Sequence, residues 1–126
     1  MLTVGVDLIE LERIARVVER WGDRFLRRIY TEQELSYCRG RIPQLAARFA
    51  AKEAVMKALG TGIRGVGWRE VEVVRPRGRA PTIALHGRAE LRAQRLGIKQ
   101  IVISLSHSRN YAIASVVGTL HEDSHQ

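Results

Sequence analysis

Two carboxylates and a lysine stand where they could share a metal-bound phosphate. Glu53 and Lys57 are four residues apart in an alanine-rich segment, and Asp7 follows the short apolar run from Leu2 to Val6. Two carboxylates, several waters and a substrate phosphate make a typical Mg²⁺ site, and Mn²⁺ accepts similar oxygen ligands. A lysine one helical turn beyond the glutamate would reach the same phosphates. The pattern indicates phosphate chemistry assisted by Mg²⁺ or Mn²⁺.

Each of these residues also has a purely structural interpretation. Glu53 precedes Lys57 in the order that favours an ion pair between successive turns of a helix. Asp7 stands just before a segment of helical periodicity, Leu8 to Trp21, and could cap that helix. On a helical wheel, however, Glu53 falls between an apolar stripe and a stripe of alanines, where a carboxylate is costly to bury unless it is paired or holds a cation. Spacing alone leaves both interpretations open.

Basic residues form a second pattern. The chain has 21 Lys and Arg against 13 Asp and Glu, a net charge of +8, which favours an acidic partner. Within the first predicted helix and its continuation, arginines recur at spacings of 3, 4, 4 and 3, which would align them on one face of a straight helix. They are Arg13, Arg16, Arg20, Arg24 and Arg27. A solvated face is the ordinary explanation of a charge run, but a stripe of one sign is better explained by an acidic partner.

A polar turn between two predicted strands is a third candidate. His107 is flanked there by Ser106, Ser108 and Arg109, a basic and hydroxyl-rich tip suited to phosphate. A lone histidine in such a turn is more often an ordinary surface residue.

Two other functions are compatible with parts of these patterns. A small nucleic-acid-binding module would explain the charge, but aromatic residues are 6% of the chain and are not interleaved with the basic ones, as base stacking requires. A magnesium-dependent phosphohydrolase could use the same Asp7 and Glu53. Release of inorganic phosphate from a nucleotide without a protein acceptor would distinguish it.

The elements that must position these residues follow from periodicity and turn signals. Thr31 to Glu34 has the spacing of a capping box, Pro43 suits the first turn of a long helix, and Gly60 suits its C-terminal cap. Strands are expected at 2–6, 70–75, 82–85, 101–105 and 112–117, helices at 8–21, 32–40, 44–59 and 87–97, and a glycine-rich loop at 61–67. Helices segregated from mostly antiparallel strands imply an α+β fold.

Length and composition limit the possible domain organisation and cellular location. A chain of 126 residues with 45% hydrophobic and 27% charged residues fits one domain, which we expect at 1–120, followed by a polar tail at 121–126. The one cysteine, Cys38, allows no internal disulfide, and no apolar run reaches the roughly 18–20 residues that span a bilayer. We expect a cytoplasmic protein with no membrane or nucleic-acid partner.

Three segments together resemble the holo-[acyl-carrier-protein] synthases, the small bacterial class of 4′-phosphopantetheinyl transferases. They are Gly5-Val-Asp-Leu-Ile-Glu-Leu-Glu-Arg13-Ile, Arg48-Phe-Ala-Ala-Lys-Glu-Ala-Val-Met-Lys-Ala-Leu-Gly-Thr-Gly-Ile63 and Ser104-Leu-Ser-His-Ser-Arg-Asn-Tyr-Ala-Ile-Ala114. The resemblance runs from Met1 to about Val117, and its middle motif is highly specific. It implies the fold of these transferases, with one lobe per chain and a mostly antiparallel sheet packed on one long central helix.

The resemblance also implies a reaction. The family moves the 4′-phosphopantetheine arm of coenzyme A to a serine of apo acyl carrier protein, for fatty acid biosynthesis, and releases adenosine 3′,5′-bisphosphate. Asp7 and Glu53 match the residues that hold Mg²⁺, and Lys57 matches the lysine beside the pyrophosphate. Glu53, directly or through a water, is the favoured base for the serine proton.

The remaining implied roles concern binding. Arg48 and His107 match residues that help to hold the nucleotide end of coenzyme A, and Phe49, Gly60 and Ser108 complete the implied substrate-binding set with Lys57. Arg13, Arg16, Arg20 and Arg24 would dock the acidic recognition helix of the carrier protein. The family's small members are homotrimers with active sites between neighbouring subunits, so a homotrimer is expected here.

Overall fold

A computed structural model describes residues 1–121 of the chain, and the predicted tail therefore lies, apart from His121, outside the described residues. The helices are α1 (Leu11–Trp21), α2 (Asp23–Ile29), α3 (Glu32–Cys38), α4 (Ile42–Leu59), α5 (Gly62–Gly65), the 3₁₀ turn η1 (Trp68–Glu70) and α6 (Gly87–Leu96). The strands are β1 (Leu2–Glu10), β2 (Val71–Val74), β3 (Thr82–Leu85), β4 (Ile98–His107) and β5 (Tyr111–Leu120). The predicted α+β class with antiparallel strands is confirmed.

The larger sheet has the strand order β1-β5-β4, with both pairs antiparallel. Leu2 pairs with Thr119 and Glu10 with Tyr111, so the first strand lies along the last strand over its whole length. The second sheet is the hairpin β2–β3. β1, β4 and β5 all extend beyond the predicted ranges, because pairing along β5 keeps residues extended whose local pattern is neutral.

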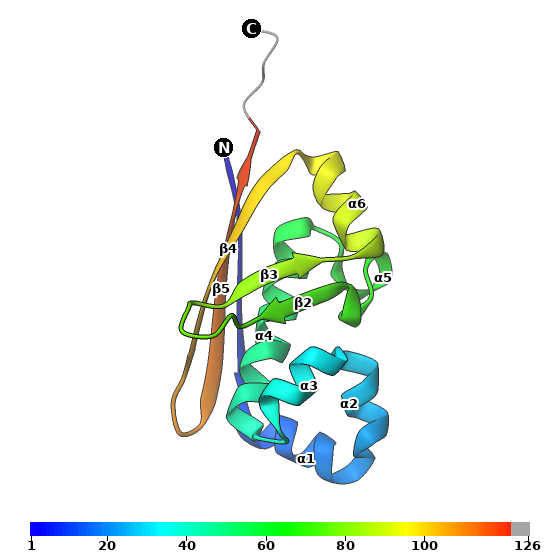
Figure 1. Ribbon diagram of the computed structural model, residues 1–126, viewed down its shortest axis with the longest axis vertical. Helices are drawn as coiled ribbons and strands as arrows, with labels where there is room; N and C mark the ends of the chain where they lie inside the picture. Colours follow the sequence, from blue (N-terminus) through cyan, green and yellow to red (C-terminus); the bar gives the residue numbers. More distant parts are fainter. Residues whose placement is uncertain (122–126) are drawn as a thin grey trace, which may run out of the picture.

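The long helix α4 is the centre of the fold. It contacts β1 and β5 on one side and α3 and β2 on the other (Figure 1). Gly60 ends it in the left-handed conformation at φ 71°, and Pro43 lies in its first turn, as predicted. Its alanines are buried, which gives a flat surface for close packing.

Gly5 sets the distance between β1 and α4. A Cβ atom at this position would lie 2.0 Å from the carbonyl oxygen of Ala54, so no side chain fits between strand and helix. The Thr3 hydroxyl donates to the carbonyl of Ala58 at 2.8 Å, one turn further along α4. The strand therefore lies directly against the helix that carries Glu53 and Lys57.

Three local predictions are wrong. The first helix begins at Leu11 and not at Leu8, because β1 continues through Glu10, and Asp7 is therefore a strand residue that caps no helix. The chain turns at Gly22, with φ 53°, at the end of the predicted helix 8–21, but it continues in a helix that was not predicted, α2, which carries Arg24 and Arg27. The predicted loop 61–67 contains the short helix α5.

Within residues 1–121, no helix combines the length and the apolar character that crossing a membrane requires.

Candidate functional site

The structure brings Asp7 and Lys57 into contact. Asp7 is paired with the buried Ala114 of β5, so its side chain lies on the face of the sheet that α4 covers. Lys57 Nζ lies 3.1 Å from Asp7 Oδ1 and donates to the carbonyl oxygen of Val6 at 2.9 Å. The ion pair of Lys57 is therefore with Asp7, and not with Glu53 as the structural interpretation of their spacing expected.

Glu53 lies close enough to Asp7 for the two carboxylates to repel. Burial, and secondly the charge of Asp7, raise the pKa of Glu53 above its usual value, while Lys57 and Arg13 act in the opposite direction. Two carboxylates that disfavour each other's charge are a donor set that a divalent cation would stabilise. Among residues 1–121, no group of three or more His, Cys, Asp and Glu side chains could hold a metal ion. Further oxygens would come from water or a substrate.

Space for a substrate adjoins this pair. A hollow of about 310 Å³ is lined by Glu53, Met56, Lys57 and Gly62. Lys57 also lines a second hollow of about 290 Å³, together with Gly60 and Arg92. Lys57, which is exposed despite its ion pair, lies between the two and can reach a ligand in either.

Arg48 lies near the start of α4 in an unusual environment. Its side chain is buried, its guanidinium carbon lies 4.2 Å from the centre of the Tyr37 ring, and one nitrogen donates to the Gln44 carbonyl at 3.4 Å. Nε and the other terminal nitrogen have no hydrogen-bond partner within the described part of the chain. Buried guanidinium donors are normally satisfied, so two buried donors without a partner favour a bound anion as the missing partner.

The other predicted substrate-binding residues are dispersed. Phe49 is part of the core, where its ring stacks on that of Trp68 at 4.9 Å. His107 is the last residue of β4, on the opposite edge of the sheet from Asp7, with β5 between them. Ser108 lies in the following turn, and its Oγ accepts from the backbone N–H groups of Asn110 and Tyr111. Within one chain, His107 and Asp7 are therefore two strand spacings apart across the sheet, roughly 10 Å, and are also offset by two residues along it.

The predicted docking arginines are exposed on α1 and α2. Arg24 also lines a hollow of about 500 Å³ with Val17, Trp21, Phe25 and Arg28. The lining of this hollow therefore combines apolar side chains with two arginines. Its charge was predicted, and its apolar part combines residues of α1 and α2 across the turn at Gly22.

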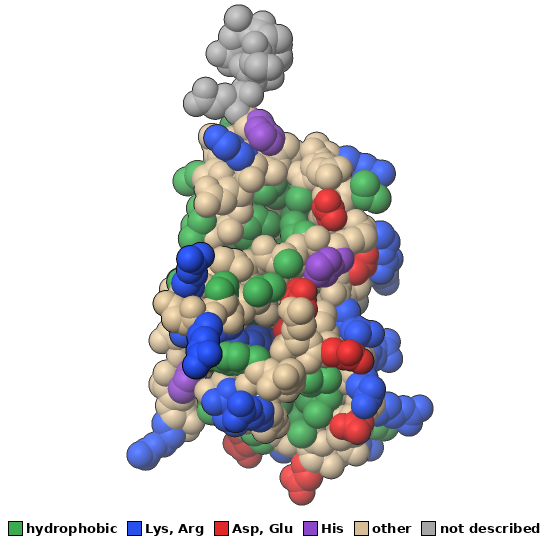
Figure 2. All heavy atoms as spheres, in the orientation of Figure 1, with side chains coloured by type: hydrophobic (Ala, Val, Ile, Leu, Met, Phe, Trp, Pro, Cys, Tyr) green, Lys and Arg blue, Asp and Glu red, His purple; other side chains and the backbone are tan. Residues whose placement is uncertain are grey.

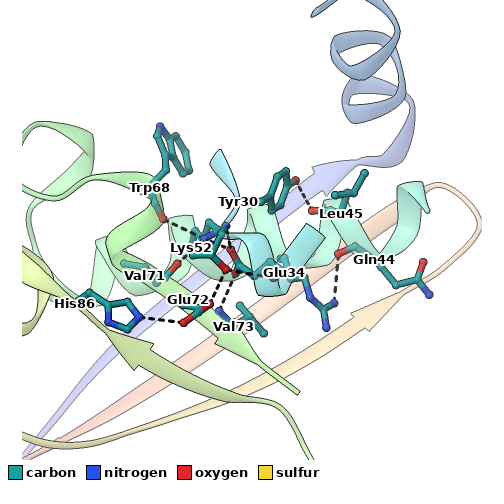
Figure 3. Close-up of polar contacts among 12 residues, drawn as sticks. Tyr30, Glu34, Gln44, Leu45, Lys52, Trp68, Val71, Glu72, Val73 and His86 are labelled. Atoms are coloured by element: carbon teal, nitrogen blue, oxygen red, sulfur yellow. Dashed lines mark hydrogen bonds and ion pairs between the residues drawn. The ribbon is translucent and has the colours of Figure 1, made fainter. Parts of the chain in front are cut away.

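Sequence reasoning missed a cluster of buried polar groups next to Arg48. Lys52 and Glu34 form a fully buried ion pair, and Glu72 lies beside it. Figure 3 shows these side chains converging from α3, α4 and β2. The capping box at Thr31 and Glu34 was recognised, and it is present, but its glutamate also binds a lysine of another helix, which no local pattern indicates.

Comparison with known proteins agrees with this arrangement. Residues 3–116 match the family model described as the 4′-phosphopantetheinyl transferase superfamily. The holo-[acyl-carrier-protein] synthase of Herpetosiphon aurantiacus is 52% identical over 125 residues, covering 94% of this chain and 98% of that protein. The synthase of Koribacter versatilis is 50% identical over 121 residues, covering 93% of this chain and 97% of that protein.

A solved structure has the same fold. The crystal structure of the Helicobacter pylori holo-[acyl-carrier-protein] synthase in complex with coenzyme A superimposes with a TM-score of 0.84 and 30% identity, covering 92% of this chain and 99% of that chain. With the predicted motifs, the antiparallel sheet on a central helix and the contact of Asp7 with Lys57 all in place, the chain belongs to the holo-[acyl-carrier-protein] synthases of the 4′-phosphopantetheinyl transferase superfamily.

Proposed function

We infer that this enzyme transfers the 4′-phosphopantetheine arm of coenzyme A to a serine of apo acyl carrier protein. The products are holo acyl carrier protein and adenosine 3′,5′-bisphosphate. The observation that carries this conclusion is the grouping of Asp7, Glu53 and Lys57 in a chain about half identical to holo-[acyl-carrier-protein] synthases along nearly its whole length.

The chemistry is a substitution at phosphorus. The serine oxygen forms a bond to the β-phosphorus of coenzyme A, and the bond from that phosphorus to the bridging oxygen breaks. The bridging oxygen leaves with adenosine 3′,5′-bisphosphate, and the serine proton passes to a base. Glu53, directly or through a water, is our candidate for this base, because its carboxylate lines the hollow beside Lys57 where the substrate would lie.

Lys57 would stabilise the leaving phosphate. Its side chain is exposed, lines the hollow beside Glu53 and the second hollow beside Gly60, and is held by Asp7 and the Val6 carbonyl. A cation fixed in this way compensates negative charge as it develops on the leaving group. We assign Gly60, exposed at the end of α4 beside Lys57, to the same substrate-binding region.

Asp7 and Glu53 would hold Mg²⁺, with Mn²⁺ as the alternative. The mutual repulsion of these carboxylates fits a divalent cation, and a diphosphate would supply further oxygen ligands. When bound, the ion neutralises charge on the diphosphate and aligns it for in-line attack.

Residues 1–120 would form the transferase domain.

Arg48, Phe49, His107 and Ser108 would serve the nucleotide end of coenzyme A. The two unpartnered nitrogens of Arg48 support a contact with an anion. Phe49 lies in the core, where its packing against Trp68 would hold the adjacent Arg48 in place. His107 and Ser108 lie on the far edge of the sheet from Asp7. We propose that they act on coenzyme A bound to a neighbouring subunit.

An uncovered sheet face supports a homotrimer. On the side away from α4, Leu2, Val4, Val6 and Leu8 are each more than half exposed, and Val102, Ile113 and Val117 continue this surface across β4 and β5. Exposed apolar patches of this kind mark protein interfaces. Because β1 and β4 are the two edges of the sheet, copies packed on this face can bring His107 of one chain towards Asp7 of another.

The acidic partner would dock on α1 and α2. Arg13, Arg16 and Arg20 project from α1 and Arg24 from α2, and Arg13 is near enough to Glu53 to affect its pKa. Lys and Arg side chains are also spread over the face shown in Figure 2. We propose that this surface binds an acidic helix of the carrier protein. We also propose that the enzyme acts in fatty acid biosynthesis and that it does so in the cytoplasm.

Intact-protein mass spectrometry tests the reaction. Apo acyl carrier protein incubated with the enzyme, coenzyme A and Mg²⁺ should gain the mass of one phosphopantetheine group, and EDTA should prevent the gain. Glu53→Gln should lower the rate about 100-fold or more while the circular dichroism spectrum is unchanged. A normal rate in this variant would refute the assignment of Glu53, and no mass gain with several carrier proteins would refute the function.

A further inference from the structure

Lys52 and Glu34 form an ion pair that is inaccessible to solvent. Lys52 Nζ lies 2.7 Å from Glu34 Oε1, and both side chains have 0% exposure. The same ammonium donates to the carbonyl oxygens of Trp68, at 3.1 Å, and Val71. All three contacts appear in Figure 3. The three N–H donors of Lys52 therefore bind one group on α3, one on η1 and one on β2.

Glu34 is equally well bound. Its Oε1 also accepts from the N–H of Thr31 at 2.8 Å, and its Oε2 accepts from the N–H of Val73 at 2.8 Å. The pair thus fastens α3 to both α4 and β2. A buried ion pair of this kind seldom makes a protein more stable than well-packed apolar residues would, since desolvation offsets the attraction. Stability alone does not account for two buried charges at this position.

The elements fastened in this way are the ones that surround Arg48. Tyr37, three residues after Glu34 on α3, places its ring 4.2 Å from the Arg48 guanidinium. Trp68, whose carbonyl binds Lys52, stacks its ring on Phe49, the residue after Arg48. Arg48 itself is 3% exposed and has two nitrogens without a partner among residues 1–121. Its orientation is thus set by packing against elements that Lys52 and Glu34 hold.

We propose that Lys52, through Glu34 and α3, is a positioning residue for Arg48. It holds Tyr37 against the guanidinium and Trp68 against Phe49, so that the two buried, unpartnered nitrogens of Arg48 keep the position in which they would bind the nucleotide end of coenzyme A. This proposal rests on the function inferred above. Lys52 itself touches no substrate.

The double variant Lys52→Met/Glu34→Gln tests the proposal, because it removes both charges and leaves neither unpaired. The KM for coenzyme A should rise about tenfold, as expected when a charged contact loses its alignment. The dissociation constant for coenzyme A measured by titration calorimetry should rise equally. The kcat and the KM for the carrier protein should stay within about twofold of the wild type, since Lys52 aligns only the nucleotide contact.

Val55→Ala is the matched control. Val55 is fully buried on the same helix and lies outside the proposed site, so its truncation loosens α4 without altering the pair. The control should lower stability and leave the KM for coenzyme A unchanged. If the double variant has a wild-type KM for coenzyme A, or if Val55→Ala raises this KM as much as the double variant does, the proposal is wrong.

Tyr37→Leu keeps the test decisive if the double variant does not fold. It removes the ring under Arg48 and leaves the buried pair intact, and it should raise the KM for coenzyme A selectively. An unchanged KM in this variant overturns the proposal. Failure of the wild-type enzyme to bind coenzyme A or to modify a carrier protein would instead refute the proposed function, so the two failures are distinguishable.

Discussion

Glu72 is held by two hydrogen-bonding side chains at the edge of the buried cluster. Its carboxylate accepts from the Thr31 hydroxyl and lies 3.0 Å from Nε2 of His86. Burial alone would raise the pKa of Glu72, but these contacts and the charge of Lys52 together lower it below the usual value. The charged form of Glu72 therefore stabilises the fold.

The consequence is a stability that falls in acid. Because the folded-state pKa of Glu72 is lowered, its contribution is fully present above the ordinary glutamate pKa of about 4.3 and is lost as the pH falls through the folded-state value. Glu72→Gln should cost roughly 1–2 kcal/mol of unfolding free energy at pH 7 and flatten the loss below about pH 4.5. Denaturant unfolding at several pH values measures both effects. Glu90→Gln, at an exposed position of α6, is the control, and an equal acid dependence in Glu72→Gln and wild type would contradict the assignment.

Single residues differ in how far their role could be predicted. Asp7, Glu53 and Lys57 were predicted to share one site, because a specific motif fixed their types and a strand end next to a long helix fixed their proximity. The pairing of Lys52 with Glu34 was not predictable, because it joins residues on two helices whose packing depends on the whole core. Local spacing also suggested that Lys57 would pair with Glu53, and the approach of β1 gave it Asp7 instead.

Among the elements, α1 illustrates how tertiary structure overrides a helical pattern. The apolar spacing from Leu8 favoured a helix, but pairing with β5 keeps residues 8–10 in β1. By contrast, both ends of α4 were predicted closely, because proline and glycine act locally at helix ends. The orientation of the basic side chains on α1 and α2 depends on Gly22, whose positive φ separates the two helices.

The proposed docking role of α1 predicts a selective kinetic effect. Arg20→Glu should raise the KM for acyl carrier protein about three- to tenfold and leave the KM for coenzyme A nearly unchanged, since it places like charges face to face. Arg20 is preferable to Arg13 for this test, because Arg13 also affects the pKa of Glu53. Arg95→Glu makes the same charge change on α6 and should affect neither constant. Equal increases in both constants for Arg20→Glu would argue against docking on α1.

At the scale of the whole molecule, length and composition predicted one domain and the order of the predicted elements an α+β fold, but neither predicted the order of the strands in the sheet. Nothing in the local pattern places β5 between β1 and β4, because strand order depends on how all the strands share the surface of α4. The same order decides where His107 and Asp7 lie relative to each other. Whether the predicted site closes within one chain or between chains therefore follows from topology and not from motif spacing.

The sheet face away from α4 predicts how the molecule assembles. Val4→Glu puts a charge on this face, where Val4 is 62% exposed, and a charge buried between subunits is costly. Sedimentation should show a trimer for the wild type and a folded monomer for Val4→Glu, with transferase activity reduced about tenfold or more. Gln94→Glu, on the exposed side of α6, should remain trimeric and active. A wild-type enzyme that is monomeric and fully active would exclude a site between subunits.

The pairing of β1 with β5 also determines the order in which the chain can fold. Leu2 lies opposite Thr119, so β1, the first strand of its sheet in sequence, has no partner in that sheet until β5, the last, has been synthesised. Contacts between such distant segments slow folding. Meanwhile β1 can rest on α4 through Gly5 and Thr3, but this contact covers one face of the strand and leaves its edges open until β5 pairs with it. Asp7 reaches its final register only when β5 pairs with β1, so we expect the proposed site to be completed late in folding.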